Sequence, residues 1–179
     1  LPISKNERYR QLVGGMTAAD VLPGARDLLV ALRTAGIRTG IASASRNAPL
    51  VLARTGLAPL IDAVADGSIV TASKPDPQVF YLAAQRLRCL PWACLGVEDS
   101  ASGVQSIRRA GMVAVGIGEH AAGADTGVAA TADLSVASLR AIFATHENRT
   151  NPYLERTMAR TAEDQRTNYA QTLAAGVKK

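Results

Sequence analysis

Short apolar runs alternate with longer amphipathic segments through most of this chain of 179 residues. After the first twenty residues the pattern predicts helices over 25–35, 47–54, 77–87 and 100–110, and strands over 38–42, 61–65, 93–97 and 113–117. Strands that are apolar on both faces and separated by helices are typical of a parallel sheet covered on both sides. The sequence therefore predicts an α/β fold, a Rossmann-like parallel sheet with helices on both faces.

The segments that flank this alternating region have weaker patterns. Residues 120–131 are rich in alanine and glycine without a clear period, so we expect a loop there. A weakly amphipathic helix is expected from residue 153 onward. We therefore divide the chain into residues 1–20, an α/β core at 21–147 and a basic helical tail at 148–179.

The formal net charge of +5 is unevenly distributed. The tail at 148–179 holds six basic and three acidic residues, so it supplies +3 of that charge. Nucleic-acid binding would require a denser basic stripe or interleaved aromatic residues, and only 4% of the residues are aromatic. We interpret the tail as a solvated helix face and expect no nucleic-acid partner, whereas small acidic molecules such as phosphates suit the remaining charge.

Other composition features exclude several further classes of protein. No run approaches the roughly 20 apolar residues that cross a bilayer, and the polar opening segment lacks a secretory pattern. Two cysteines, Cys89 and Cys94, are too few for a disulfide scaffold and have no neighbouring set of zinc ligands. We expect reduced, half-buried thiols in a cytoplasmic protein without a membrane segment.

Polar residues follow three of the predicted strands. In an open parallel sheet, ligands bind outside the carboxyl ends of the strands, so these positions are the candidates for function. The first segment contains Ser43, Ala44, Ser45, Arg46 and Asn47. Small hydroxyl residues and backbone N–H groups at the start of a helix favour an anion site, although Ser45 or Asn47 could instead serve only as a helix cap.

The second segment places Lys74 between a serine and two prolines. Proline restricts the backbone, so the lysine should project from a stiff loop and could neutralise a phosphoryl oxygen or a carboxylate. The alternative is an ordinary surface lysine in a turn.

The third segment places Glu98 and Asp99 directly after a strand and before a helix. Paired carboxylates of this kind suit Mg²⁺, whereas the alternative is that Asp99 or Ser100 caps the helix. An anion site, a lysine and an acidic pair on three successive strand ends together indicate magnesium-assisted phosphoryl chemistry.

These three segments resemble motifs of the haloacid dehalogenase (HAD) superfamily, and more closely those of its β-phosphoglucomutase group. Ser43-Ala-Ser45 is similar to the second motif, Lys74-Pro to the third and Gly96-Val-Glu-Asp-Ser100 to the fourth. The likeness extends from about Lys5 to Gly118.

The resemblance implies a role for each matched residue. Ser43, Ala44 and Lys74 would hold the transferring phosphoryl group, with Ser43 and Lys74 acting in catalysis. The second phosphate of the substrate would be held by Ser45, Arg46 and Asn47. Glu98 and Asp99 would bind Mg²⁺, and Lys5 would reach the substrate from the end of a helical cap.

The chain departs from the superfamily at its first motif. These enzymes use an Asp-x-Asp on the first strand, where the first aspartate attacks phosphorus, and this sequence contains no Asp-x-Asp. Because the chain also begins at Leu1 rather than methionine, we expect a HAD-like core truncated at its N-terminus, in which residues 1–20 are a remnant of the cap and linker.

The missing first strand has a structural consequence. In the superfamily it lies between the strands that precede Ser43 and Glu98. Those two strands must therefore either pair with each other or leave rows of backbone N–H and C=O groups unpaired.

Our leading hypothesis is the core of a β-phosphoglucomutase-like enzyme that interconverts β-D-glucose 1-phosphate and glucose 6-phosphate. We expect the isolated chain to be a monomer if it folds, and to have negligible turnover because it lacks the nucleophile. One alternative is a HAD phosphatase of a small phosphorylated metabolite. Another is a non-catalytic remnant that binds phosphate or Mg²⁺ weakly.

Overall fold

Residues 11–146 are the part of the chain that the computed structural model describes. Contacts within the chain place these residues in one compact unit. The helix predicted for the tail at 148–179 and the candidate residue Lys5 both lie outside the described residues.

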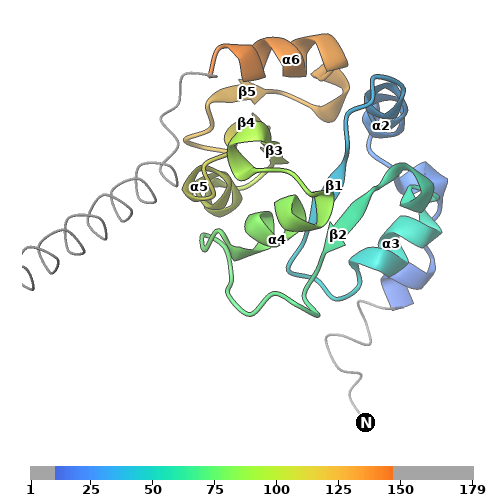
Figure 1. Cartoon of the computed structure of the whole chain (residues 1–179). Coiled ribbons are helices and arrows are strands. Elements are labelled where there is room, and N and C mark those ends of the chain that lie inside the picture. The colour runs from blue at the N-terminus through green and yellow to red at the C-terminus, as the bar shows by residue number, and fades with distance from the viewer. Residues whose placement is uncertain (1–10, 147–179) are drawn as a thin grey trace, which may run out of the picture. The chain divides into compact units, whose positions relative to one another are not determined.

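Helices and strands follow one another in the predicted order (Figure 1). The α-helices are α2 (Ala25–Thr34), α3 (Ala48–Arg54), α4 (Gln78–Leu87), α5 (Ala101–Arg109) and α6 (Val136–Ala144). The strands are β1 (Gly40–Ala42), β2 (Ala63–Ala65), β3 (Leu95–Glu98), β4 (Val113–Ile117) and β5 (Thr126–Val128). Short 3-10 helices lie at Ala18–Asp20, Ala58–Leu60, Pro91–Ala93 and Thr131–Asp133. Residues 11–14 are also helical.

The eight predicted helices and strands are confirmed, with ends that differ by one or two residues. The loop predicted over 120–131 is wrong in part, because it contains β5. This strand of three residues forms by parallel pairing with the end of β4, a long-range contact that leaves no periodic pattern in its own sequence. Helix α6 was not predicted, and Ser135 caps its first turn by accepting a hydrogen bond from the Ser138 N–H.

The strands form two parallel sheets rather than one continuous sheet. In the first sheet β1 pairs with β2, with Gly40 opposite Ala63. In the second sheet β4 lies between β3 and β5, with Leu95 opposite Val113. Strands β1 and β3 are not paired with each other in the described part of the chain. Of the two arrangements expected for these strands, the structure therefore has the one in which they leave backbone N–H and C=O groups unpaired along one edge.

The exposure of the strands follows from this division. Four of the five residues of β4 are buried, as expected for a strand paired on both sides. Gly40 in β1 and Val97 in β3 are exposed, Val97 by 40%. We also expected residues 38–42 to form a buried strand, and this is wrong in part: Ile41 and Ala42 are only half-buried, because only one edge of β1 is paired in the described part of the chain.

Helices cover both faces of the second sheet. Ala114 and Val115 are neighbours in β4, so their side chains point to opposite faces. Ala114 belongs to a core cluster formed with α4 and α5, whereas Val115 packs with residues of α2 and α6. This arrangement confirms the predicted α/β fold class.

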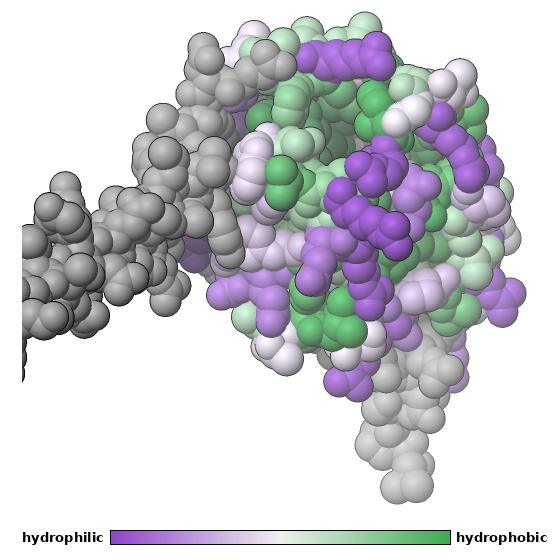
Figure 2. All heavy atoms as spheres, in the orientation of Figure 1, coloured by the Kyte–Doolittle hydropathy of each residue, from purple (hydrophilic) through white to green (hydrophobic). Residues whose placement is uncertain are grey.

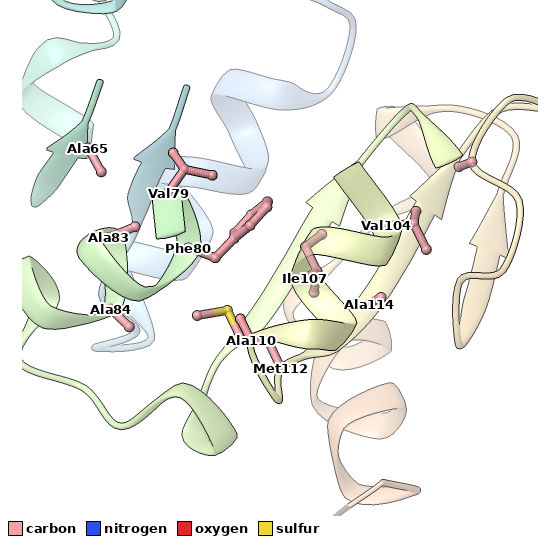
Figure 3. Close-up of a cluster of buried hydrophobic side chains, with 11 residues drawn as sticks. Ala65, Val79, Phe80, Ala83, Ala84, Val104, Ile107, Ala110, Met112 and Ala114 are labelled. Atoms are coloured by element: carbon pink, nitrogen blue, oxygen red, sulfur yellow. The ribbon is translucent and has the colours of Figure 1, made fainter. Parts of the chain in front are cut away.

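The core that includes α4 and α5 connects the two sheets. Helix α4 packs on β1 and β2, and α5 packs on β3 and β4. Figure 3 shows Phe80 of α4 pointing toward Ile107 of α5 in this core, which also contains Val79 and Val104. A Cβ atom on Gly96 would lie 2.7 Å from Ile107, so the glycine lets α5 approach β3 closely. The two sheets are therefore held together through helices rather than through strand pairing.

The surface has no single large apolar area on the face shown in Figure 2, where hydrophobic and hydrophilic residues are interspersed. None of the described helices is long and apolar enough to span a bilayer. Cys89 and Cys94 are both free and half-buried, as predicted.

Candidate functional site

The loop after β1 is shaped by its own serine hydroxyls. The Ser43 hydroxyl accepts a hydrogen bond from the Ser45 N–H (3.1 Å), and the Ser45 hydroxyl accepts one from the Asn47 N–H (3.2 Å). The Ser43 N–H donates to the Ala65 carbonyl of β2 at 2.9 Å, which fixes the start of the loop. A hydroxyl that accepts one bond can still donate its own proton, so both serines can serve an anion.

The helix-capping alternative is wrong for Asn47. Asn47 occupies the N-cap position of α3, but its side chain makes no capping hydrogen bond. The Ser45 hydroxyl is bonded to Asn47 itself rather than to an N–H group inside the helix. The Ser43 hydroxyl therefore organises the loop, whereas the Ser45 hydroxyl fixes the entry to α3.

A turn after β2 contacts this loop directly. The Arg46 side chain donates its Nε–H to the Gly67 carbonyl at 3.1 Å. The carboxylate of Asp66, which is 9% exposed, accepts hydrogen bonds from both the N–H and the hydroxyl of Ser68. Sequence reasoning did not assign a role to this turn, although Asp-Gly-Ser directly after a strand is a recognisable turn signal.

Lys74 is not an ordinary surface lysine. Its side chain is 21% exposed and its ammonium group forms an ion pair with the Glu98 Oε2. The same ammonium lies 5.3 Å from the centre of the Phe80 ring, within the range of a cation–π contact. The interpretation of Lys74 as an exposed lysine in a turn is therefore wrong.

The loop around Lys74 is held against α5. The Ser106 hydroxyl donates to the Asp76 carbonyl at 2.6 Å, and Arg109 donates to the Pro75 carbonyl at 3.2 Å. These two bonds, together with the prolines, restrict the loop on which the ammonium is carried.

Glu98 is enclosed by groups that donate to it. Its Oε1 accepts a hydrogen bond from the Ser100 hydroxyl at 3.0 Å, while Lys74 donates to Oε2. A Cβ atom on Gly103 would lie 2.1 Å from the Glu98 carboxyl carbon, so the side chain lies directly against the backbone of α5. Burial alone would raise the pKa of Glu98, but the hydrogen bond and charge of Lys74, together with hydrogen bonds from Asp99 and Ser100, outweigh it and the pKa is lowered. Glu98 is therefore ionised at neutral pH.

The capping alternative is correct for Ser100 and wrong for Asp99. The Ser100 hydroxyl accepts a hydrogen bond from the Gly103 N–H at 3.2 Å, which caps α5. Asp99 does not occupy the N-cap position and is exposed at the end of β3.

The donor set suits Mg²⁺ only in part. Glu98 and Asp99 provide carboxylate oxygens, which Mg²⁺ prefers. No group of three or more histidine, cysteine, aspartate or glutamate residues in the described part of the chain could hold a metal ion. Because both oxygens of Glu98 already accept hydrogen bonds, the more accessible ligand is Asp99, and further oxygens would have to come from water or substrate.

The structure brings the predicted residues together in two groups. Lys74, Glu98 and the adjacent Asp99 form one group, and the loop at 43–47 forms the other with the turn at 66–68. The segment that runs from this turn to Lys74 connects them along the chain.

The family model of haloacid dehalogenase-like hydrolases matches residues 3–111. The chain belongs to this family. The β-phosphoglucomutase of Bacillus subtilis (strain 168) is 40% identical over 134 residues, which cover 74% of this chain and 59% of that enzyme. The chain therefore spans less than two thirds of the length of that relative.

A solved structure and a phosphatase are also similar. The crystal structure of β-phosphoglucomutase from Clostridium difficile matches with a TM-score of 0.75 and 30% identity, over 82% of this chain and 71% of that one. The fructose-1-phosphate phosphatase of Escherichia coli (strain K12) is 41% identical over 78 residues, covering 44% of this chain and 42% of that enzyme. The relatives thus include both mutases and phosphatases, and the predicted resemblance to β-phosphoglucomutase within the HAD superfamily is confirmed.

Proposed function

We propose that this chain is the α/β core of a magnesium-dependent phosphoryl-transfer enzyme of the β-phosphoglucomutase type, which interconverts β-D-glucose 1-phosphate and glucose 6-phosphate. The observation that supports the proposal most is the ion pair between Lys74 and Glu98, with Asp99 next in the chain. It joins a cation to an acidic pair at the carboxyl end of a parallel strand, where α/β proteins bind their ligands.

Each residue has a distinct task in this proposal. The Lys74 ammonium neutralises an oxygen of the transferring phosphoryl group, and the Ser43 hydroxyl and Ala44 N–H donate hydrogen bonds to the same group. Mg²⁺, held by Asp99 and Glu98, supplies further positive charge to that group when bound.

The second phosphate of the substrate is assigned to the loop after β1, through Ser45, Arg46 and Asn47. A guanidinium is suited to this task because it presents several N–H donors in a fixed plane. Lys5, which lies outside the described residues, would contact the sugar.

The sequence contains no Asp-x-Asp, so the chain alone lacks the attacking carboxylate of the superfamily. Positioned cations and hydroxyls stabilise charge but do not replace a nucleophile. We therefore expect the purified chain to bind its ligands without measurable conversion of β-D-glucose 1-phosphate. Conversion to glucose 6-phosphate by the pure protein would contradict this expectation. Sequencing the DNA upstream of the Leu1 codon tests it independently, since an in-frame strand ending in Asp-x-Asp supports the enzyme over a non-catalytic remnant.

Binding to the chain itself tests the proposed site. We expect Mg²⁺ to strengthen the binding of glucose 6-phosphate, measured by calorimetry or by the fluorescence of Trp92. Asp99→Asn should abolish the effect of Mg²⁺, and Lys74→Met should weaken the binding of the sugar phosphate itself. Glu119→Gln is the matched control, because the Glu119 side chain is 88% exposed. Wild-type behaviour of both site variants would exclude this site.

A phosphatase of a small phosphorylated metabolite is the second candidate, supported by the similarity to fructose-1-phosphate phosphatase. A mutase of this type must hold a sugar bisphosphate during its cycle, whereas a phosphatase needs to hold only one phosphate. Tighter binding of glucose 1,6-bisphosphate than of glucose 6-phosphate therefore favours the mutase, and the reverse order favours the phosphatase.

A further inference from the structure

The turn at Asp66–Ser68 is fixed by hydrogen bonds within itself. The Asp66 carboxylate accepts bonds from the N–H and the hydroxyl of Ser68. The Asp66 carbonyl accepts bonds from the N–H groups of Ile69 (3.1 Å) and Val70 (3.2 Å). Because Asp66 is also buried at the end of β2, the turn has little freedom to move.

The turn and the loop after β1 are in direct contact. A Cβ atom on Gly67 would lie 2.2 Å from the Ala44 carbonyl oxygen and 3.0 Å from the Arg46 backbone nitrogen. Only glycine permits this approach of two backbones. The approach brings the Gly67 carbonyl to the Arg46 Nε–H, 3.1 Å away.

The charges on the two segments are complementary. Arg46 and Arg86 both lie near the Asp66 carboxylate and favour its ionised form, although the hydrogen bonds from Ser68 have the larger effect on its pKa. Arg86 is itself held by a hydrogen bond to the Val64 carbonyl of β2. An arginine of the candidate site therefore lies near an ionised carboxylate that a serine holds in place.

We propose that the Asp66–Ser68 turn is a positioning element that orients Arg46 toward the second anionic group of the substrate. The inference rests on the proposed function only in assigning that anion to Arg46. Holding Nε–H on a carbonyl fixes the plane of the guanidinium, and its terminal N–H groups, which make no hydrogen bond to the described residues, are directed to the ligand. A side chain that is already ordered loses less conformational entropy when the ligand binds. The matching substrates are sugar phosphates with a second phosphate.

The first experiment measures the order of Arg46 in the full chain without any ligand. The solvent exchange of the Arg46 Nε–H is followed by NMR, with Arg46→Lys to identify the signal. We expect exchange to be several-fold faster in Ser68→Ala than in wild type, and restored in Ser68→Thr, which keeps a hydroxyl. Ser138→Ala is the matched control, because Ser138 makes local hydrogen bonds in α6. Equal exchange in wild type and Ser68→Ala would overturn the proposal.

The second experiment separates positioning from general stability. Calorimetry compares glucose 1,6-bisphosphate with inorganic phosphate for the same variants. Ser68→Ala should weaken bisphosphate binding about tenfold, the effect of one hydrogen bond to a charged group, and leave inorganic phosphate binding unchanged. Loss of both affinities together with a lower melting temperature would assign a structural role and overturn the proposal.

The two experiments also distinguish failure of the inference from failure of the proposed function. If wild-type protein binds the bisphosphate no more tightly than inorganic phosphate, Arg46 does not serve a second anion and that part of the proposed function is wrong. The exchange rates still decide whether the turn orders Arg46.

Discussion

Replacing Gly103 by alanine should disrupt the acidic end of β3 without disturbing the rest of α5. The new Cβ atom would lie 2.1 Å from the carboxyl carbon of Glu98, so the Glu98 side chain must move away. That movement breaks its ion pair with Lys74 and its hydrogen bond with Ser100. The backbone can stay in place, because the Glu98 side chain is flexible.

Two opposing terms determine the size of the effect. Alanine in place of glycine inside a helix stabilises by about 0.5–1 kcal/mol. Losing hydrogen bonds to a charged, mostly buried carboxylate costs about 1.5–3 kcal/mol. In the wild-type background Gly103→Ala should therefore lower the free energy of unfolding by about 0.5–2.5 kcal/mol. In a Glu98→Ala background the clash is gone, so Gly103→Ala should stabilise by about 0.5–1 kcal/mol.

The effect of Gly103→Ala on the free energy of unfolding should thus change sign between the two backgrounds. Urea unfolding measures it on wild type, both single variants and the double variant. Gly14 provides the matched control, because it is also helical and a Cβ atom there would have no neighbour within 4 Å among residues 11–146. Gly14→Ala should have the same effect in both backgrounds. If Gly103→Ala also has the same effect in both backgrounds, the contact between Gly103 and Glu98 does not control this site.

Three further predictions concern stability and reactivity. Because the pKa of Asp66 is lowered from 3.8, mainly by hydrogen bonds from Ser68, its contribution to stability is present above that value and lost as the pH falls through the lower native pKa. Asp66→Asn should therefore make the free energy of unfolding less dependent on pH between 5 and 2, roughly the range of this titration. An unchanged dependence on pH would contradict the lowered pKa of Asp66. Burial raises the pKa of the Cys94 thiol to about 12. At pH 8, roughly the pKa of an ordinary thiol, iodoacetamide should therefore label Cys94 at least about tenfold more slowly in the native chain than in urea, as mass spectrometry can measure. Ile107→Ala should cost about 2–5 kcal/mol in urea unfolding because Ile107 is fully buried, whereas Val30→Ala, at a half-exposed position, should cost well under half of that.

The helices and strands could be predicted wherever the spacing of apolar residues along the sequence indicates which positions are buried. Strand β4 is an uninterrupted apolar run and is buried along most of its length. Strand β5 has no such pattern, because its formation depends on the edge of β4. For the same reason the exposure of Val97 could not be predicted, since it follows from the unpaired edge of β3.

The candidate site could be predicted as a set of residue types but not as a set of contacts. Lys74 and Glu98 were each identified from their positions after strands, but they are 24 residues apart in the sequence and no local pattern shows that they pair. The turn at Asp66–Ser68 was overlooked because a turn after a strand is common and only its contact with Arg46 suggests a role.

The amino-acid sequence by itself determined the fold class, the three polar loops and the absence of an Asp-x-Asp, because these depend on residue type and on spacing along the chain. Only the tertiary structure decided that the strands form two sheets, that Glu98 pairs with Lys74 and that Arg46 is held by the Gly67 carbonyl. Such contacts join distant parts of the chain, and their formation depends on how helices α4 and α5 pack between those parts.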